Sequence, residues 1–76
     1  MGGHLKNTKL LQQIALKLKS LREEKGLTQE DVYNDTGIHI SRIETSRINI
    51  TVSTLSALCC YFEIPISNFF DDLRQF

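Results

Sequence analysis

Four side chains of this sequence suggest a metal site or a nucleophile more than the others. They are two histidines, His4 and His39, and two adjacent cysteines, Cys59 and Cys60. A zinc site needs four ligands at defined spacings, and one Cys-Cys dipeptide does not supply them. The sequence also offers no paired carboxylates, phosphate loop or Ser/His/Asp set from which an active site could be built. We therefore expect no enzymatic activity, no cofactor and no metal.

The charged side chains are balanced, which limits how the chain could bind nucleic acid. Nine Lys and Arg residues are matched by nine Asp and Glu residues, so the formal net charge is zero. Eight of the cations and six of the anions lie in residues 1–50, which leaves that part at +2 and the remainder at −2. A protein that held nucleic acid by charge alone would be far more basic. If the chain binds DNA, we expect it to use a few well-placed groups.

Length and composition exclude several classes of protein. With 76 residues, 41% hydrophobic and 24% charged, the chain is typical of one soluble globular domain. The longest uncharged stretch, residues 48–62, is interrupted by Thr, Ser and Asn and predicts no membrane span. The start of the chain lacks the apolar segment of a secretory signal. Because adjacent cysteines cannot staple a loop, we expect a cytoplasmic protein.

Apolar residues recur at steps of three and four along most of the chain, which predicts helices and no strand. We expect five helices over about residues 8–25, 28 to 34 or 37, 37–46, 51 or 53 to 62, and 65–73. They would form one all-α domain over residues 8–76, preceded by a flexible segment at residues 1–7. The expected core comprises Leu18, Leu21, Val32, Ile40, Ile43, Leu55, Leu58 and Phe69.

Capping signals mark most of the expected helix ends. Thr8 is the expected N-cap of the first helix, and Gly26 would end that helix in the left-handed conformation. Thr28, with Asp31 three residues later, resembles a capping box and predicts the start of the second helix. Pro65 suits the first turn of the last helix.

The last two helices are expected to bury most of their apolar side chains. The predicted inward residues are Val52, Leu55, Leu58, Cys59 and Phe62 in the fourth helix, and Ile66, Phe69, Phe70 and Leu73 in the fifth. Together with Phe76, the fifth helix and the tail carry more large apolar side chains than a small core readily hides. We therefore expect Phe70, Leu73 or Phe76 to form a two-fold interface between two copies.

Two helices joined by a short turn over residues 28–46, braced on either side, form the arrangement that places a short helix in the DNA major groove. The residues there read Leu21-Arg22-Glu23-Glu24-Lys25-Gly26-Leu27-Thr28-Gln29-Glu30, followed by Ile40-Ser41-Arg42-Ile43-Glu44. This pattern resembles the Cro/phage-repressor (XRE-type) helix-turn-helix family of small bacterial or phage DNA-binding regulators. The resemblance covers about residues 18–70 and implies a compact, lambda-repressor-like five-helix domain.

The sequence departs from the family pattern in the length of the motif. Thr28 and Glu44 are sixteen residues apart, which is three fewer than the family usually has. Either Thr36 caps the third helix and the second helix is very short, or Gly37 ends the second helix and the third is truncated. We favour the first reading, because it supplies a cap and places His39 and Ser41 on the outer face of the third helix.

Residue chemistry indicates which groups would contact DNA. Gln29 could donate its amide to a phosphate oxygen, and Arg42 could bind guanine bidentately or hold a phosphate. His39 and Ser41 could reach base edges. The resemblance implies that the loop before the fourth helix follows the DNA backbone, with Arg47 as its strongest phosphate ligand. The full expected set is Thr28, Gln29, His39, Ser41, Arg42, Thr45, Ser46, Arg47 and Asn49.

The resemblance assigns a structural role to two further charged residues. It implies that Arg22 of the first helix and Glu44 of the third form an ion pair that pins the third helix to the first. Neither side chain is then expected to contact DNA. The loss of one partner would be costly, because the other charge would remain without its counterpart.

These observations lead to one principal function and one alternative. We expect a sequence-specific, double-stranded DNA-binding transcriptional regulator, a repressor or autoregulator, that acts as a homodimer without a small-molecule ligand. On two half-sites about one helical turn apart, the two copies would combine two weak DNA contacts. The alternative is a protein-interaction module, antitoxin-like or an adaptor, that retains the fold without binding DNA. The zero net charge and the shortened motif are the reasons for considering this alternative.

Overall fold

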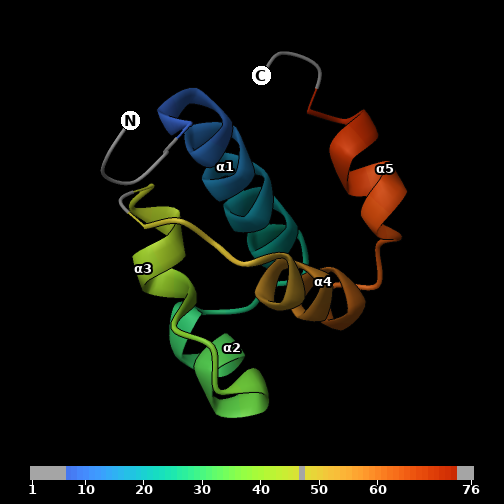
Figure 1. Cartoon of the computed structure of the whole chain (residues 1–76). Coiled ribbons are helices and arrows are strands. Elements are labelled where there is room, and N and C mark those ends of the chain that lie inside the picture. The colour runs from blue at the N-terminus through green and yellow to red at the C-terminus, as the bar shows by residue number, and fades with distance from the viewer. Residues whose placement is uncertain (1–6, 47, 74–76) are drawn as a thin grey trace.

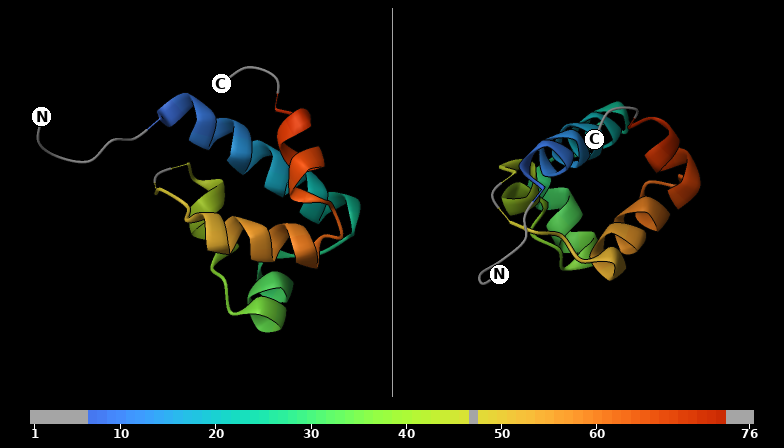
Figure 2. Two further views of the ribbon diagram at one scale, coloured as in Figure 1. Left: turned by 45° about the vertical axis from the view of Figure 1, so that its right-hand side comes forward. Right: turned by 45° about the horizontal axis from the view of Figure 1, so that its top comes forward.

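The structure, a computed structural model, describes residues 7–46 and 48–73. Within these ranges it contains five helices and no strand: α1 (Thr8–Glu24), α2 (Gln29–Thr36), α3 (Ile40–Glu44), α4 (Val52–Tyr61) and α5 (Ile66–Asp71). α1 lies above α4, with α3 on one side, α5 on the other and α2 at the bottom of the view (Figure 1). Two further views keep α3 and α5 on opposite sides of α1 and α4 (Figure 2). The expected all-α, five-helix fold is confirmed.

The core lies between α1 and the other four helices. All eight side chains predicted to form it are buried, and Leu18, Val32, Ile40, Leu58 and Phe69 are 0% exposed. Phe62 and Cys59 of the α4 segment join the same cluster. Burying one large apolar side chain contributes roughly 1.5–3 kcal/mol relative to leaving it exposed. This cluster therefore provides the main driving force that holds α3 against the rest of the domain.

The ends of α1 differ slightly from the prediction. Asn7, not Thr8, is the N-cap, and its Oδ1 accepts a hydrogen bond from the backbone N–H of Leu10 at 3.0 Å. Asn and Thr are both good caps, and the first of the two in the chain takes the role. At the other end, Gly26 has a φ of 67°, the left-handed conformation expected after the helix.

α2 begins with the predicted capping box and ends later than we favoured. Thr28 N–H donates to Asp31 Oδ2 at 2.8 Å, and Asp31 N–H donates to Thr28 Oγ1 at 3.0 Å. At the C-terminus Gly37 has a φ of 76°, and its N–H donates to Tyr33 O at 2.8 Å. The favoured reading, in which Thr36 caps the third helix, is therefore wrong.

The side chain of Thr36 shows why the second helix keeps its full length. Its Oγ1 donates to Val32 O within α2 at 2.7 Å and accepts from the N–H of Ile38 at 3.0 Å. The hydroxyl thus serves the end of α2 and not the start of α3. α3 begins at Ile40 and ends at Glu44, so it is the third helix that is short.

The last two helices show two errors in the predicted apolar stripes. Thr51 caps α4, its Oγ1 accepting from Thr54 N–H at 3.0 Å, but Val52 is 75% exposed. Val52 is the first residue of α4, and the helix starts beyond the edge of the core. In α5, Phe69 is buried while Ile66 is 37% exposed. Leu73 is only 7% exposed, so the core uses it and it is not available for an interface between copies.

Among the described residues, no helix combines the length and the apolar character that crossing a membrane requires.

Candidate nucleic-acid interface

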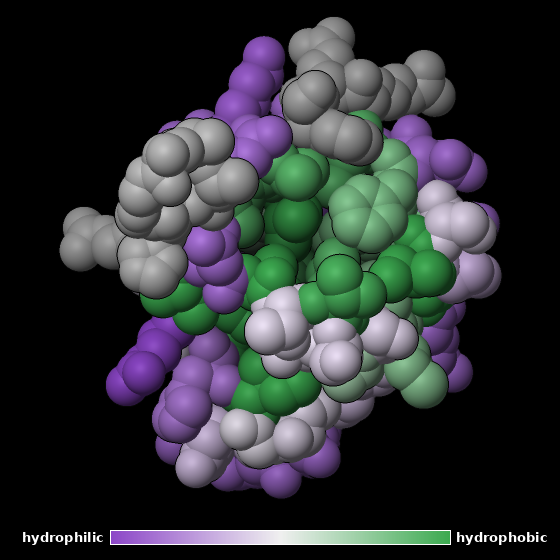
Figure 3. Space-filling model, in the orientation of Figure 1, coloured by the Kyte–Doolittle hydropathy of each residue, from purple (hydrophilic) through white to green (hydrophobic). Residues whose placement is uncertain are grey.

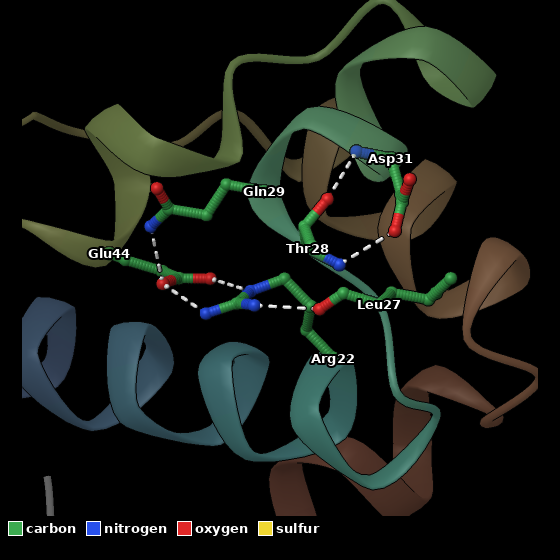
Figure 4. A network of polar contacts seen from close by, with 6 residues as sticks. All are labelled: Arg22, Leu27, Thr28, Gln29, Asp31 and Glu44. Atoms are coloured by element: carbon green, nitrogen blue, oxygen red, sulfur yellow. Dashed lines mark hydrogen bonds and ion pairs between the residues drawn. The ribbon is translucent and has the colours of Figure 1, made fainter.

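α3 is held against α1 by a charged hydrogen-bond network (Figure 4). Arg22 Nε donates to Glu44 Oε2 at 2.8 Å, and Arg22 Nη2 donates to Glu44 Oε1 at 3.1 Å. Arg22 Nη1 also donates to Leu27 O at 2.7 Å, which ties down the segment before α2. The two charged side chains are only 11% and 6% exposed. The fork-to-fork geometry fixes the direction of α3 as well as its distance from α1.

The network has a physical effect on the guanidinium. The hydrogen bond to Glu44 raises the pKa of Arg22 above its ordinary value, against the opposing effect of burial. The charged form of Arg22, which the ion pair requires, is therefore favoured further. Its fork is committed to Glu44 and to Leu27 O, which matches the structural role that the family resemblance implies.

Gln29 links α2 to the carboxylate of Glu44 as well. Its Nε2 donates to Glu44 Oε1 at 2.9 Å, so that Glu44 accepts from both α1 and α2 (Figure 4). An amide nitrogen carries two hydrogens, and one of them is used here. Gln29 can therefore position α3 and still offer its second N–H to a phosphate.

The outer face of α3 carries the polar side chains that the sequence singled out. Ile40 and Ile43 are buried, whereas Ser41 and Arg42 are exposed. Five residues make less than two turns, so few side chains of this helix can face a partner. Of these, Arg42 has the longest reach and a planar fork suited to guanine.

His39 is the N-cap residue of α3 but makes no side-chain capping bond. Its ring instead stacks on Tyr33 of α2, with centroids 4.4 Å apart and an interplanar angle of 29°. Tyr33 is 44% exposed, so the pair presents an aromatic surface at the corner between α2 and α3. Sequence reasoning missed Tyr33 as a neighbour of His39, because their contact depends on how the shortened α3 meets α2.

The remaining predicted contacts lie around the loop after α3. Thr45 Oγ1 donates to Arg42 O at 2.6 Å, and Ser46 adopts a left-handed φ of 64° that turns the chain away from α3. Asn49 is exposed, and Arg47 lies outside the described residues. Thr28 is exposed at the start of α2, where its hydroxyl serves the capping box. Thr45, Ser46 and Asn49 thus lie in the segment between α3 and α4, whereas Thr28 lies at the start of α2.

The two cysteines considered for metal or thiol chemistry differ in their burial. Cys59 is buried, and burial raises the pKa of its thiol, while Cys60 is exposed. His39 lies at the far corner of the motif, and His4 is outside the described residues. Within residues 7–46 and 48–73, no group of three or more His, Cys, Asp or Glu side chains could hold a metal ion. Cys59 serves the core as a small apolar side chain.

A capped α2, a left-handed turn at Gly37 and a short α3 braced by α1 define a helix-turn-helix domain. A family model described as Helix-turn-helix matches residues 18–69, which is more than half of the chain. The chain therefore belongs to the Cro/phage-repressor-type (XRE) helix-turn-helix family, a family of DNA-binding regulators. Searches of the curated proteins and of the solved structures gave no match.

Proposed function

We propose that this protein is a sequence-specific transcriptional regulator that binds double-stranded DNA through α3. It would act in the cytoplasm as a homodimer, as a repressor or autoregulator. The observation that carries the proposal is the pair of hydrogen-bond donors on Glu44. Arg22 of α1 and Gln29 of α2 both bind its carboxylate and so hold α3 from two sides, an arrangement we call the bracket on Glu44. Reading base edges requires a recognition helix whose direction is fixed in advance, and this bracket supplies it.

Each polar group around α3 has a role that follows from its chemistry. Arg42 binds guanine O6 and N7 bidentately, and Ser41 reaches a neighbouring base. The ring of His39, which stacks on Tyr33, contacts DNA at the N-terminal end of α3. The second N–H of Gln29 and the guanidinium of Arg47 hold phosphates and set the register of the domain on the duplex.

The shortness of α3 supports the homodimer. A helix of five residues presents few side chains to a groove, and a chain with no net charge neutralises few phosphates. One copy alone would therefore bind weakly and read few base pairs. Two copies on adjacent half-sites combine two such contacts, which makes a dimer the natural binding unit.

A protein-interaction module remains the second candidate function, and the shortness of α3 supports it as well. The motif is short at the helix that normally enters the groove, since α3 begins only at Ile40. If this helix does not reach base edges, its exposed polar face would instead contact a protein partner. The two functions differ in whether the protein binds duplex DNA with a marked dependence on salt.

Titration of a labelled duplex of random sequence at several salt concentrations separates these functions. We expect log affinity to fall linearly with log salt, because bound phosphates release their counterions. Arg47→Ala should weaken all sequences alike and lower the slope by about one per monomer. Lys19→Ala, which removes the same charge from the exposed face of α1, should change neither. Absence of binding by the wild type at low salt would leave the interaction module as the function.

A further inference from the structure

An apolar groove lies on the side of the domain between the first half of α1 and the start of α4. Its volume is about 230 Å³, and its lining includes Leu10, Ile14, Ile50, Leu55 and Phe70. Hydrophobic residues gather over this part of the surface, with hydrophilic residues around them (Figure 3). The groove is smaller than the roughly 300–1,000 Å³ of pockets that enclose a drug-sized molecule. Its size and its apolar lining suit one or two inserted side chains.

Val52 projects from the rim of this groove. It lines the groove and is 75% exposed, the highest value among the large apolar side chains of the described residues. A hollow and a projecting apolar side chain therefore stand next to each other on the same surface. An interface with two-fold symmetry needs this arrangement, because each copy must supply both the inserted group and the site that receives it.

The absence of charge from the groove lining favours a second copy over a charged partner. None of the residues that line the groove is charged. The whole stretch of residues 48–62, which includes α4, contains no Asp, Glu, Lys, Arg or His. Two identical surfaces of this kind meet without like-charge repulsion and without stripping water from a charge. A strongly charged partner would find no counter-charge here.

The position of the groove also fits the DNA-binding side of the domain. Asn49 and Ile50 line the groove, and they belong to the segment that joins α3 to α4. Two copies joined here would bring their two α3–α4 loops to either side of the two-fold axis. The two α3 helices would then be held at one fixed separation, as adjacent half-sites require.

We propose that this groove is the homodimer interface, with Val52 of each copy inserted into the groove of the other. The proposal rests on the homodimer put forward above and names its face. It differs from the expected interface of Phe70, Leu73 or Phe76: Leu73 is buried in the core, and Phe76 lies outside the described residues. Only Phe70 is retained, as part of the lining that receives the partner's valine.

Sedimentation of the full chain at micromolar concentrations tests this interface without DNA. The wild type should be dimeric, and Val52→Arg should weaken self-association by about tenfold or more, because a charge would have to enter the apolar groove. Leu16→Arg is the matched control: Leu16 is 68% exposed on α1 and does not line the groove, so this variant should remain dimeric. Unchanged helicity by circular dichroism confirms that both variants fold.

A photo-crosslinking amino acid at position 52 identifies the occupant directly. We expect a covalent dimer whose crosslinked peptide comes from the first half of α1 of the other copy. A monomeric wild type, an unchanged dimer in Val52→Arg, or a crosslink to the ends of the same chain would each overturn the proposal. DNA binding is read separately: a dimer that binds no duplex contradicts the regulator function and leaves this interface standing. Duplex binding by a protein that stays monomeric contradicts this interface and leaves the DNA-binding function standing.

Discussion

Glu44 is the residue through which α3 is hydrogen-bonded to two other helices. It accepts hydrogen bonds from Arg22 of α1 and Gln29 of α2, and its side chain is only 6% exposed. Coulomb attraction at such a site is offset by the cost of removing two charges from water, so the net stability of the pair is small. The loss of one partner is a different matter, because the remaining charge cannot regain its hydration.

Glu44→Ala should therefore destabilise the protein by roughly 1–3 kcal/mol, since it leaves the Arg22 guanidinium largely buried without its carboxylate. Thermal melts of the wild type and the variant measure the difference. Glu23→Ala, which removes an exposed carboxylate from α1, is the control and should shift the midpoint little. If Glu44→Ala melts at the same temperature as the wild type, the bracket does not hold α3.

The helices show how much of the architecture could be predicted from the sequence. The capping box at Thr28 and the periodicity of α1 are local signals, and both agree with the structure. The boundary between α2 and α3 could not be decided locally, because Thr36 and Gly37 each suit two roles. In the structure Gly37 takes the left-handed conformation that ends α2, and the Thr36 hydroxyl bonds back to Val32 O within that helix. The exposure of Val52 depends on where α4 starts relative to the core, which spacing alone does not show.

The exposed residues of α3 could be predicted from their side-chain types and spacing. The contacts made at the turn between α2 and α3 could not. Ser41 and Arg42 are exposed on α3 in the positions that their spacing from Ile40 and Ile43 indicates. The stack of Tyr33 on His39 was not predictable, because it follows from how the shortened α3 meets α2.

A tyrosine also links α4 to α2, and its titration reports on that contact. Tyr61 Oη donates to Asp35 Oδ2 at 2.6 Å, and this bond raises the pKa of Tyr61 to about 12. The unfolded value is about 10, so the folded state holds this proton more tightly. The contribution is complete below about pH 10 and is lost as the pH rises from about 10 to 12.

In Asp35→Ala the pKa of Tyr61 should fall from about 12 toward its ordinary value, and stability should depend less on pH above about 10. Tyrosinate absorbance during an alkaline titration measures the pKa. Because the chain contains two tyrosines, Tyr61→Phe identifies which transition belongs to Tyr61. A titration of Asp35→Ala that matches the wild type would mean that the α2–α4 bond does not form in solution.

At the scale of the whole molecule, two surfaces adjoin the loop between α3 and α4. One is polar, carries Ser41 and Arg42, and is proposed to face DNA. The other is uncharged, contains the groove beside Val52, and is proposed to join two copies. The core and the bracket on Glu44 hold the two surfaces in a fixed relation, which would let dimerisation set the spacing of the DNA contacts. The proposed function therefore depends on sequence-specific binding of duplex DNA through α3.

Selection of bound sequences from a random duplex pool, carried out with the wild type and with Arg42→Ala, tests this claim most directly. We expect the wild type to enrich a two-fold symmetric site with a guanine preference in each half. Arg42→Ala should bind that site about 1–3 kcal/mol more weakly and lose the preference at that one position. If the wild type enriches no sequence, or if Arg42→Ala selects the same site with the same preference, α3 does not read DNA through Arg42 and the account is contradicted.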